Sequence, residues 1–293
     1  KRKPSWCANP VPARASPWSA FLTSEKLNST PAWKSAATRP SSSRYRPGSG
    51  CGCFNSSSRT SSGGYRAYTG RAESLDALKV AVVGTNAVGG KIVTAIRVAR
   101  ALGAVGVGAE VVGTSTLAWF QGGAHTTLLD SVPQRHVAGA LEGAMLAAYE
   151  RSRPRVLLLE GRGGLLDPAR SCDLELLVTA RPDAVILQHA PTHESIPAGD
   201  PYGLSVVTRH LDVVEAITGR PVLAVTLSHM GRDEGACRAA ADLFRGVLDC
   251  PVTDVFINGP EPVAAMLLDL CAVAAPAPAH TCRSRGFSPG IAT

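Results

Sequence analysis

The feature that most constrains the fold of this chain is a regular alternation of short apolar runs and longer amphipathic stretches between residues 79 and 275. A continuous apolar run such as LKVAVVG (78–84) is typical of a strand buried on both faces, whereas KIVTAIRVARALGA (91–104) repeats apolar residues at helical spacing. Strands are expected over 78–84, 109–114, 155–161, 183–191, 221–229 and 252–259, and helices over 91–104, 132–152, 174–181, 206–219 and 233–249. Strands that alternate with helices in this way are joined by crossovers, so the pattern predicts a three-layer α/β domain with a mostly parallel sheet over 79–275.

The stretch GTNAVGGK (84–91) lies between the first expected strand and the first expected helix, which is the context of a phosphate-binding loop. Glycines let backbone N–H groups converge on an anion, the helix start adds positive potential, and Lys91 would reach the outer phosphates. A turn that binds nothing and a dinucleotide fingerprint are the alternatives, but the glycine spacing does not fit the fingerprint and no acid ends the second strand. The predicted phosphate- or nucleotide-binding residues are Gly84, Thr85, Asn86, Gly89, Gly90, Lys91 and Thr94.

Other polar residues follow the later strands, and in a parallel sheet these positions gather at one rim. Glu160 and His189 are the predicted catalytic residues, because a carboxylate or an imidazole there could act as a base. Ser228 and His193 are further candidates at the rim. We expect this rim to border one cleft of roughly 300–1,000 Å³ together with Lys91. A capping carboxylate and a structural histidine are the alternatives, and the histidine spacing predicts no metal site.

The two ends of the chain differ in composition from its middle. Residues 1–78 contain twelve Lys and Arg but three acids, are rich in Ser and Gly, and are expected to be disordered, as is the tail, 276–293. The basic segment resembles a transit peptide or else is an artefact or a fragment, since the first methionine is Met145. The net charge of +7 therefore belongs to the ends, and we expect no nucleic-acid partner for the folded part.

The eight cysteines are scattered without a Cys-x-x-Cys pair, which indicates free thiols in a reducing compartment. No apolar run reaches the roughly 18–20 residues of a membrane span, and no signal-peptide core follows the charged start. We therefore expect a cytoplasmic protein without a membrane partner, or an organelle-targeted one if the basic segment is a genuine transit peptide.

Several stretches, taken in order, resemble one known family. VGTNAVGGK (83–91), LLLEGRGGLLDP (157–168), RPDAVILQHAP (181–191) and PVLAVTLSHMGRDE (221–234) follow the order seen in the DUF1611 family, as do AEVVGTSTLAWF and DSVPQRHVAGALE. The resemblance spans about residues 79–270. It implies the family's carboxy-terminal P-loop NTPase-like domain, which is related to dethiobiotin synthetase.

Some members of this family are described as D-glutamate N-acetyltransferases. The resemblance thus implies an N-acyltransferase with acetyl-CoA as a substrate and D-glutamate or a related amino acid as the small-molecule partner, with His189 or Glu160 taking the proton from the amine. Two alternatives stay open. One is an ATP-dependent ligase or kinase with Lys91 on the phosphates and Glu160 near Mg²⁺, and the other is a nucleotide-binding protein without turnover. Assembly into a homo-oligomer is also left open.

The chain departs from the family pattern at several positions. Asn86 stands where the family usually has Asp, Val93 where it has Thr, Arg162 where it has Gln, and Ala190 where it has Glu. The family also carries an amino-terminal Rossmann-like domain, which nothing in 1–78 could build. We therefore expect a divergent copy, or one without its first domain, that retains phosphate binding and has weak or no acetyl transfer.

Overall fold

The computed structural model describes residues 65–273, apart from 88–89, 122, 124, 192–195 and 230–232. Its centre is a seven-stranded sheet in the order β3-β2-β4-β1-β5-β6-β7, and each pair of neighbouring strands is parallel. The strands are β1 (Leu78–Gly84), β2 (Ala109–Gly113), β3 (His125–Thr126), β4 (Val156–Glu160), β5 (Ala184–His189), β6 (Val222–Leu227) and β7 (Val252–Asp254). The predicted α/β fold with a parallel sheet is confirmed.

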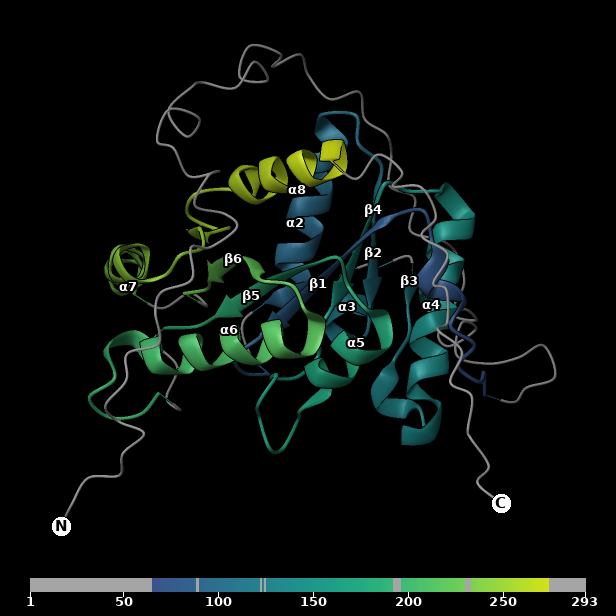
Figure 1. Cartoon of the computed structure of the whole chain (residues 1–293), viewed down its shortest axis with the longest axis horizontal. Coiled ribbons are helices and arrows are strands. Elements are labelled where there is room, and N and C mark those ends of the chain that lie inside the picture. Colours follow the sequence, from purple (N-terminus) through teal and green to yellow (C-terminus); the bar gives the residue numbers. More distant parts are fainter. Residues whose placement is uncertain are drawn as a thin grey trace, which may run out of the picture.

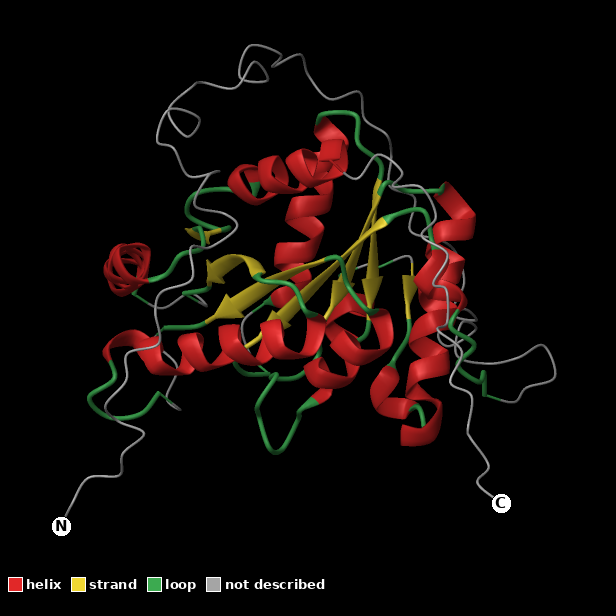
Figure 2. Ribbon diagram, viewed as in Figure 1, coloured by secondary structure: helices red, strands yellow, loops and turns green. Residues whose placement is uncertain are grey.

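Helices cover both faces of this sheet, which gives the three layers that Figures 1 and 2 show. The helices are α2 (Lys91–Ala104), α3 (Thr116–Phe120), α4 (Val137–Ser152), α5 (Cys172–Ala180), α6 (Leu204–Thr218), α7 (Glu234–Val247) and α8 (Glu261–Val273), with short 3-10 turns η4 (Arg71–Ser74), η5 (Leu129–Ser131), η6 (Gln134–His136) and η7 (Pro201–Gly203). α2 and α8 pack on one face, α4 to α7 pack on the other, and α3 follows β2 directly.

β1 is the central strand, and its side chains divide between the two cores. Val80 and Val82 belong to the core under α2 and α8, whereas Ala81 and Val83 belong to the core under α4 to α7. Successive side chains of a strand point to opposite faces, so the buried middle of a strand with helices on both sides is apolar at successive positions. This requirement explains the apolar run over 80–83, which follows Lys79 near the start of the strand.

Most predicted elements are present, and the differences have local causes. The expected strand over 252–259 ends at Asp254, because the Oδ1 of Asp254 accepts hydrogen bonds from the backbone N–H groups of Phe256 (2.7 Å) and Ile257 (3.1 Å). These bonds turn the chain toward α8. Three elements of the structure, α3, β3 and α8, are not among the predicted ones.

The packed part of the chain begins before the boundary expected at residue 79. Thr69 donates from its N–H (2.7 Å) and its hydroxyl (2.9 Å) to Glu142 of α4, and the N–H of Ala72 donates to the other oxygen of the same carboxylate (3.3 Å). Ala72 itself is buried in the core. The expectation of poor packing is therefore corrected for residues 65–78.

The remainder of the segments expected to be disordered, 1–64 and 276–293, lies outside the described residues. Four cysteines fall in the described part of the chain, where they are free thiols: Cys172, Cys237, Cys250 and Cys271. Across that same part, none of the helices combines the length and apolarity that a membrane crossing requires.

Candidate functional site

The glycine-rich loop predicted to bind phosphates leaves the sheet at its centre. It connects β1 to α2, and β1 lies between β4 and β5. Because the strands are parallel, the loops that follow β4, β1 and β5 meet at the same rim, where ligands bind in sheets of this kind. The candidate site is therefore built from these three loops and the start of α2.

Lys91 is the first residue of α2, and its ammonium lies between two glycine-rich loops. Its Nζ donates to the carbonyl oxygens of Asn86 (3.0 Å) and Gly163 (2.7 Å), and the residue is 4% exposed. Both acceptors are neutral, and Lys91 forms no ion pair with any carboxylate of the described residues. Burial lowers the pKa of Lys91, and the charges of Asp173 and Glu160 oppose that shift. The site thus holds a buried cation without a direct counter-ion.

Two glycines of the first loop meet different structural requirements. A Cβ on Gly84 would lie 2.7 Å from the backbone oxygen of Asn86 and 2.9 Å from the Nζ of Lys91, so a side chain there would collide with the backbone of the loop. Gly90 has a φ of 71°, in the left-handed region that favours glycine. Gly89 lies outside the described residues. Phosphate binding by this loop stays a prediction.

The loop that follows β4, residues 161–164, lies directly against the first loop. The N–H of Leu165 donates to the carbonyl of Gly84 (2.8 Å), and a Cβ on Gly164 would approach the Cα of Asn86 to 2.9 Å. The two loops are therefore in backbone contact, and the second glycine-rich stretch is explained by the close approach of the first.

Asp173, in the first turn of α5, is the main site residue that the sequence analysis missed. It is fully buried, and its carboxylate accepts hydrogen bonds from the N–H groups of Gly84 (2.7 Å) and Gly163 (2.8 Å). Burial raises the pKa of Asp173 to about 6, while Lys91 and the two backbone N–H groups oppose the shift. An acid among the apolar residues of CDLELLV, just after a glycine-rich loop, was the available signal.

Glu160 ends β4 at the rim, as predicted, but both of its carboxylate oxygens are bound within the protein. One accepts from the N–H groups of Thr114 (2.8 Å) and Ser115 (3.2 Å), and the other from the hydroxyl of Ser115 (2.7 Å). Burial raises the pKa of Glu160, and these hydrogen bonds oppose the shift. The carboxylate therefore holds the turn between β2 and α3, and the predicted role of Glu160 as a base stays a prediction that would require it to leave these partners.

His189 ends β5, is 2% exposed, and has a partner on each ring nitrogen. Its Nε2 lies 2.7 Å from the carbonyl oxygen of Tyr202, which can only accept, so Nε2 carries the proton. Nδ1 then accepts from the hydroxyl of Thr85 (2.8 Å), and the ring packs against Phe244 of α7. This geometry corrects the expectation of a histidine open to substrate, because His189 instead fixes Thr85 in the phosphate loop.

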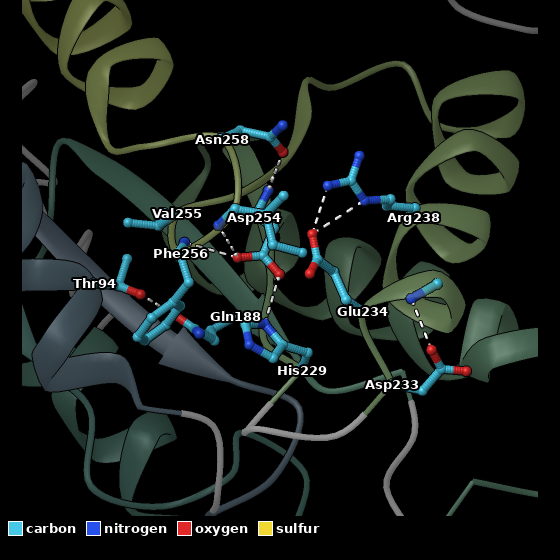
Figure 3. Close-up of polar contacts among 12 residues, drawn as sticks. Thr94, Gln188, His229, Asp233, Glu234, Arg238, Asp254, Val255, Phe256 and Asn258 are labelled. Carbon is cyan, nitrogen blue, oxygen red and sulfur yellow. Dashed lines mark hydrogen bonds and ion pairs between the residues drawn. The ribbon is translucent and has the colours of Figure 1, made fainter.

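Thr94 lies one turn into α2 and faces the sheet rather than the loop. It is fully buried, and its hydroxyl donates to the side-chain oxygen of Gln188 (2.6 Å), as Figure 3 shows. The same oxygen of Gln188 also accepts from Thr226 (3.3 Å). A hydroxyl that is used inside the core cannot contact a phosphate at the rim, so the prediction that Thr94 binds phosphate is corrected.

The remaining candidates at the rim contribute less to the site. Ser228 is buried, and its backbone N–H donates to the carbonyl of His189 (2.9 Å), which ties the ends of β5 and β6 together. His193 lies outside the described residues. Ser228 is thus placed at the rim, as predicted, through its backbone.

A second polar cluster lies at the ends of β6 and β7, on the side of β1 opposite β4 (Figure 3). The Oδ2 of Asp254 faces the Nδ1 of His229 at 3.4 Å, and the ring of Phe256 packs against the His229 ring at 86°. The guanidinium of Arg97 lies over the Phe256 ring, 4.7 Å from its centroid. A Cβ on Gly90 would come within 3.7 Å of that ring, so this cluster borders the phosphate loop.

Two hollows lie beside α5 rather than over the phosphate loop. A narrow cavity of about 10 Å³ is bordered by Glu160 and Arg162, and an open hollow of about 470 Å³ is bordered by Glu175 and Val178. Of the described residues predicted for the rim, Glu160 alone borders either hollow, so neither is the expected cleft around Lys91. In the described part of the chain, no cluster of three or more His, Cys, Asp or Glu side chains is placed to hold a metal ion.

One family model and one solved structure match most of the described residues. The family described as "Domain of unknown function (DUF1611_C) P-loop domain" matches residues 66–264. A crystal structure of a DUF1611 family protein from Anabaena variabilis ATCC 29413 aligns with a TM-score of 0.58 at 24% identity, covering 69% of this chain and 60% of that one. Chloroplast FtsY from Physcomitrella patens aligns with a TM-score of 0.41 at 19% identity, covering 74% and 70%. No curated protein sequence matches the chain. The chain spans 60% of the length of the Anabaena variabilis protein.

Proposed function

The chain belongs to the DUF1611 family, to its P-loop domain, and on that basis we propose that loop 84–91 binds the phosphate groups of a nucleotide-containing ligand. The observation that carries this proposal is the ammonium of Lys91, which is buried between two glycine-rich loops and bonded to carbonyl oxygens. Among the described residues, Asp173 and Glu160 offset the burial of this charge only in part and neither forms an ion pair with it, so an anionic phosphate would provide a direct counter-ion. The positive end of the α2 dipole acts at the same point.

The favoured ligand is acetyl-CoA, whose nucleotide portion carries phosphates. In the D-glutamate N-acetyltransferase-like reaction that the family resemblance implies, the acetyl group would pass from the thioester to the amine of D-glutamate or a related amino acid. Phe256 supports a nucleotide rather than free phosphate as the ligand, because its ring borders the loop at Gly90 and an aromatic ring can pack against a base.

Acetyl transfer also requires a group that takes a proton from the substrate amine. The two predicted bases, His189 and Glu160, are both buried and bonded to protein groups in this structure. We therefore assign phosphate binding to this domain and expect weak or no acetyl transfer by its residues in this arrangement.

The same geometry favours a second candidate, a nucleotide-binding protein without turnover. Candidate bases that are bonded within the protein, beside a buried lysine at the glycine loop, are what such a protein would show. A third candidate, a ligase or kinase of the dethiobiotin synthetase type, would use ATP with Mg²⁺ near Glu160, whose oxygens would first have to leave Thr114 and Ser115.

Thermal unfolding in the presence of ATP with Mg²⁺, GTP, CoA and acetyl-CoA tests these candidates, because a ligand that binds only the native state raises the midpoint. We expect CoA and acetyl-CoA to raise it. A rise with ATP alone would favour the second or third candidate, and ATP turnover would then separate those two. If none of the four compounds raises the midpoint, loop 84–91 is not a nucleotide phosphate site.

Replacement of Lys91 by alanine is the matched test of the loop. A hydrogen bond to a charged group contributes about 1.5–3 kcal/mol, so we expect the affinity for CoA, measured by calorimetry, to fall roughly 10- to 100-fold. The control is Lys79→Ala, since Lys79 is also buried and donates to a carbonyl, that of Glu73 (3.3 Å), at the opposite end of β1. Unchanged affinity in Lys91→Ala would contradict the proposal.

A further inference from the structure

We propose that Asp173 is a positioning residue that holds the second glycine loop, 161–164, against the first and thereby places the ammonium of Lys91 for phosphate binding. This inference rests on the proposed function of loop 84–91. It concerns a residue that lies 82 positions beyond Lys91 in the sequence and that sequence motifs of the phosphate loop do not include.

One carboxylate, that of Asp173, joins both loops. The Oδ2 of Asp173 accepts from the N–H of Gly84, the last residue of β1, and Oδ1 accepts from the N–H of Gly163 in the second loop. The distances are 2.7 and 2.8 Å, as expected for hydrogen bonds to a charged acceptor. α5 therefore fixes both loops through a single side chain.

Gly163 links this carboxylate to Lys91. Gly163 is bound from both sides, since its N–H donates to Asp173 and its carbonyl accepts from the Nζ of Lys91 at 2.7 Å. A displacement of Gly163 would therefore move the acceptor that fixes the ammonium. The negative charge of Asp173 is also the largest of the charge effects that keep Lys91 protonated against the effect of burial.

The second glycine loop, 161–164, also packs closely around the carboxylate of Asp173. A Cβ on Gly161 would lie 2.5 Å from the Oδ1 of Asp173, and a Cβ on Gly163 would overlap the carbonyl oxygen of Arg170. Glycines at both positions leave room for the carboxylate and the backbone that surround it. The glycine pattern of the second loop is thus explained by Asp173 as well as by the first loop.

A bound phosphate would compete with Asn86 and Gly163 for the ammonium of Lys91. While the lysine is bonded to the ligand, the hydrogen bond from Asp173 would still hold Gly163, so the second loop would keep its place. Asp173 would act through Lys91 and the loops rather than by touching the ligand.

The test replaces Asp173 by asparagine, which keeps the size of the side chain but removes the charge and one acceptor. We expect the affinity for CoA and for ATP, each titrated by calorimetry, to fall at least tenfold. We also expect the alkaline limit of binding, set by deprotonation of Lys91, to move to lower pH. The other groups whose charges raise the pKa of Lys91 are Glu160 of β4 and Cys172 of α5, and both are unchanged in this variant.

Asp183→Asn is the matched control. The carboxylate of Asp183 accepts from the backbone N–H of Lys79 (2.9 Å) at the amino end of the same strand, so its loss removes the same kind of bond. We expect this variant to keep both the affinity and its pH profile. A merely structural role for Asp173 would lower stability in both variants without moving the alkaline limit of binding in either, and that result would overturn the inference.

Hydrogen exchange on the wild type keeps the inference testable if Asp173→Asn does not fold. The N–H groups of Gly84 and Gly163 should both be protected, and protection at Gly163 should rise when CoA or ATP binds. Rapid exchange at Gly163 would refute the bridge. If the wild type binds neither compound, the proposed function fails even where the bridge is protected; if it binds and Asp173→Asn binds equally well, only the positioning role fails.

Discussion

The two ends of β1 carry the same pair of groups, a buried lysine and a carboxylate that accepts a backbone N–H. At the amino end, the Nζ of Lys79 donates to one carbonyl at 3.3 Å, and Asp183 accepts one N–H. At the carboxyl end, the Nζ of Lys91 donates to two carbonyls, and Asp173 accepts two N–H groups from different loops. Each group at the carboxyl end thus joins two segments.

This difference shows that a buried charge and a hydrogen bond do not by themselves mark a functional site. The amino end of β1 has both, and its lysine is held by a residue only six positions away in the chain. The carboxyl end adds two glycine loops in backbone contact with each other, at the rim where parallel sheets bind their ligands. Two substitutions and one change of pH test this difference between the two ends of β1.

The largest expected effect is that of Gly163→Ala in the second loop. The added Cβ would overlap the backbone oxygen of Arg170, which cannot move aside as a flexible side chain can. We expect a loss of about 3 kcal/mol in the free energy of unfolding, measured by urea denaturation, together with weaker phosphate binding.

The control for this change is Gly108→Ala, at the amino ends of the strands. A Cβ there would have its nearest neighbour, the Cα of Pro154, at 3.8 Å, which is ordinary contact. We expect a change within about 0.5 kcal/mol and full binding. Equal losses in the two variants would mean that the tight packing of glycine is not specific to the carboxyl rim.

A smaller effect is expected from pH. Burial raises the pKa of Asp173 to about 6, above its ordinary value of 3.8, so the folded state binds this proton more tightly than the unfolded state. The contribution of Asp173 to stability is therefore greatest below pH 3.8 and is lost as the pH rises through 6. Between pH 7 and pH 4.5, it should add about 2 kcal/mol to the free energy of unfolding.

The measurement is the difference in unfolding free energy between the wild type and Asp173→Asn across this range, because asparagine does not titrate. A difference that grows as the pH falls toward 4.5 agrees with an enclosed carboxylate. A constant difference would show that Asp173 is as open to solvent as an ordinary surface acid, and the contrast with the amino end would disappear.

The layers of the fold could be predicted from the sequence because each depends on a local pattern. The continuous apolar run of β1 and the helical spacing of α2 are set by burial on both faces and on one face, respectively. The end of β7 could not be predicted in the same way, since the apolar pattern continues through Phe256 and Ile257. A side chain, that of Asp254, ends the strand by accepting two backbone N–H groups.

The site was harder to predict because its contacts are between distant parts of the chain. The position of Lys91 follows from a strand, a glycine loop and a helix in sequence, and the structure places it there. Whether His189 and Glu160 are open to a substrate depends on Tyr202 and Ser115, which no local pattern connects to them. Asp173 was missed for the same reason.

The smallest expected effect is that of Thr94→Val, which marks where the site ends. Valine has nearly the same shape and loses only the hydroxyl that donates to Gln188 (2.6 Å), and the Gln188 oxygen retains Thr226 as a donor (3.3 Å). We expect a loss of about 1 kcal/mol in the free energy of unfolding and CoA affinity within twofold of the wild type. Thr226→Val removes the longer of the two bonds and should cost less, so the pair of variants measures the contribution of this buried hydroxyl.

A tenfold loss of CoA affinity in Thr94→Val, with stability unchanged, would instead place Thr94 among the phosphate-binding residues and extend the site one turn into α2. Unchanged affinity would show that the polar groups behind the loop stabilise the sheet, as those at the amino end of β1 do.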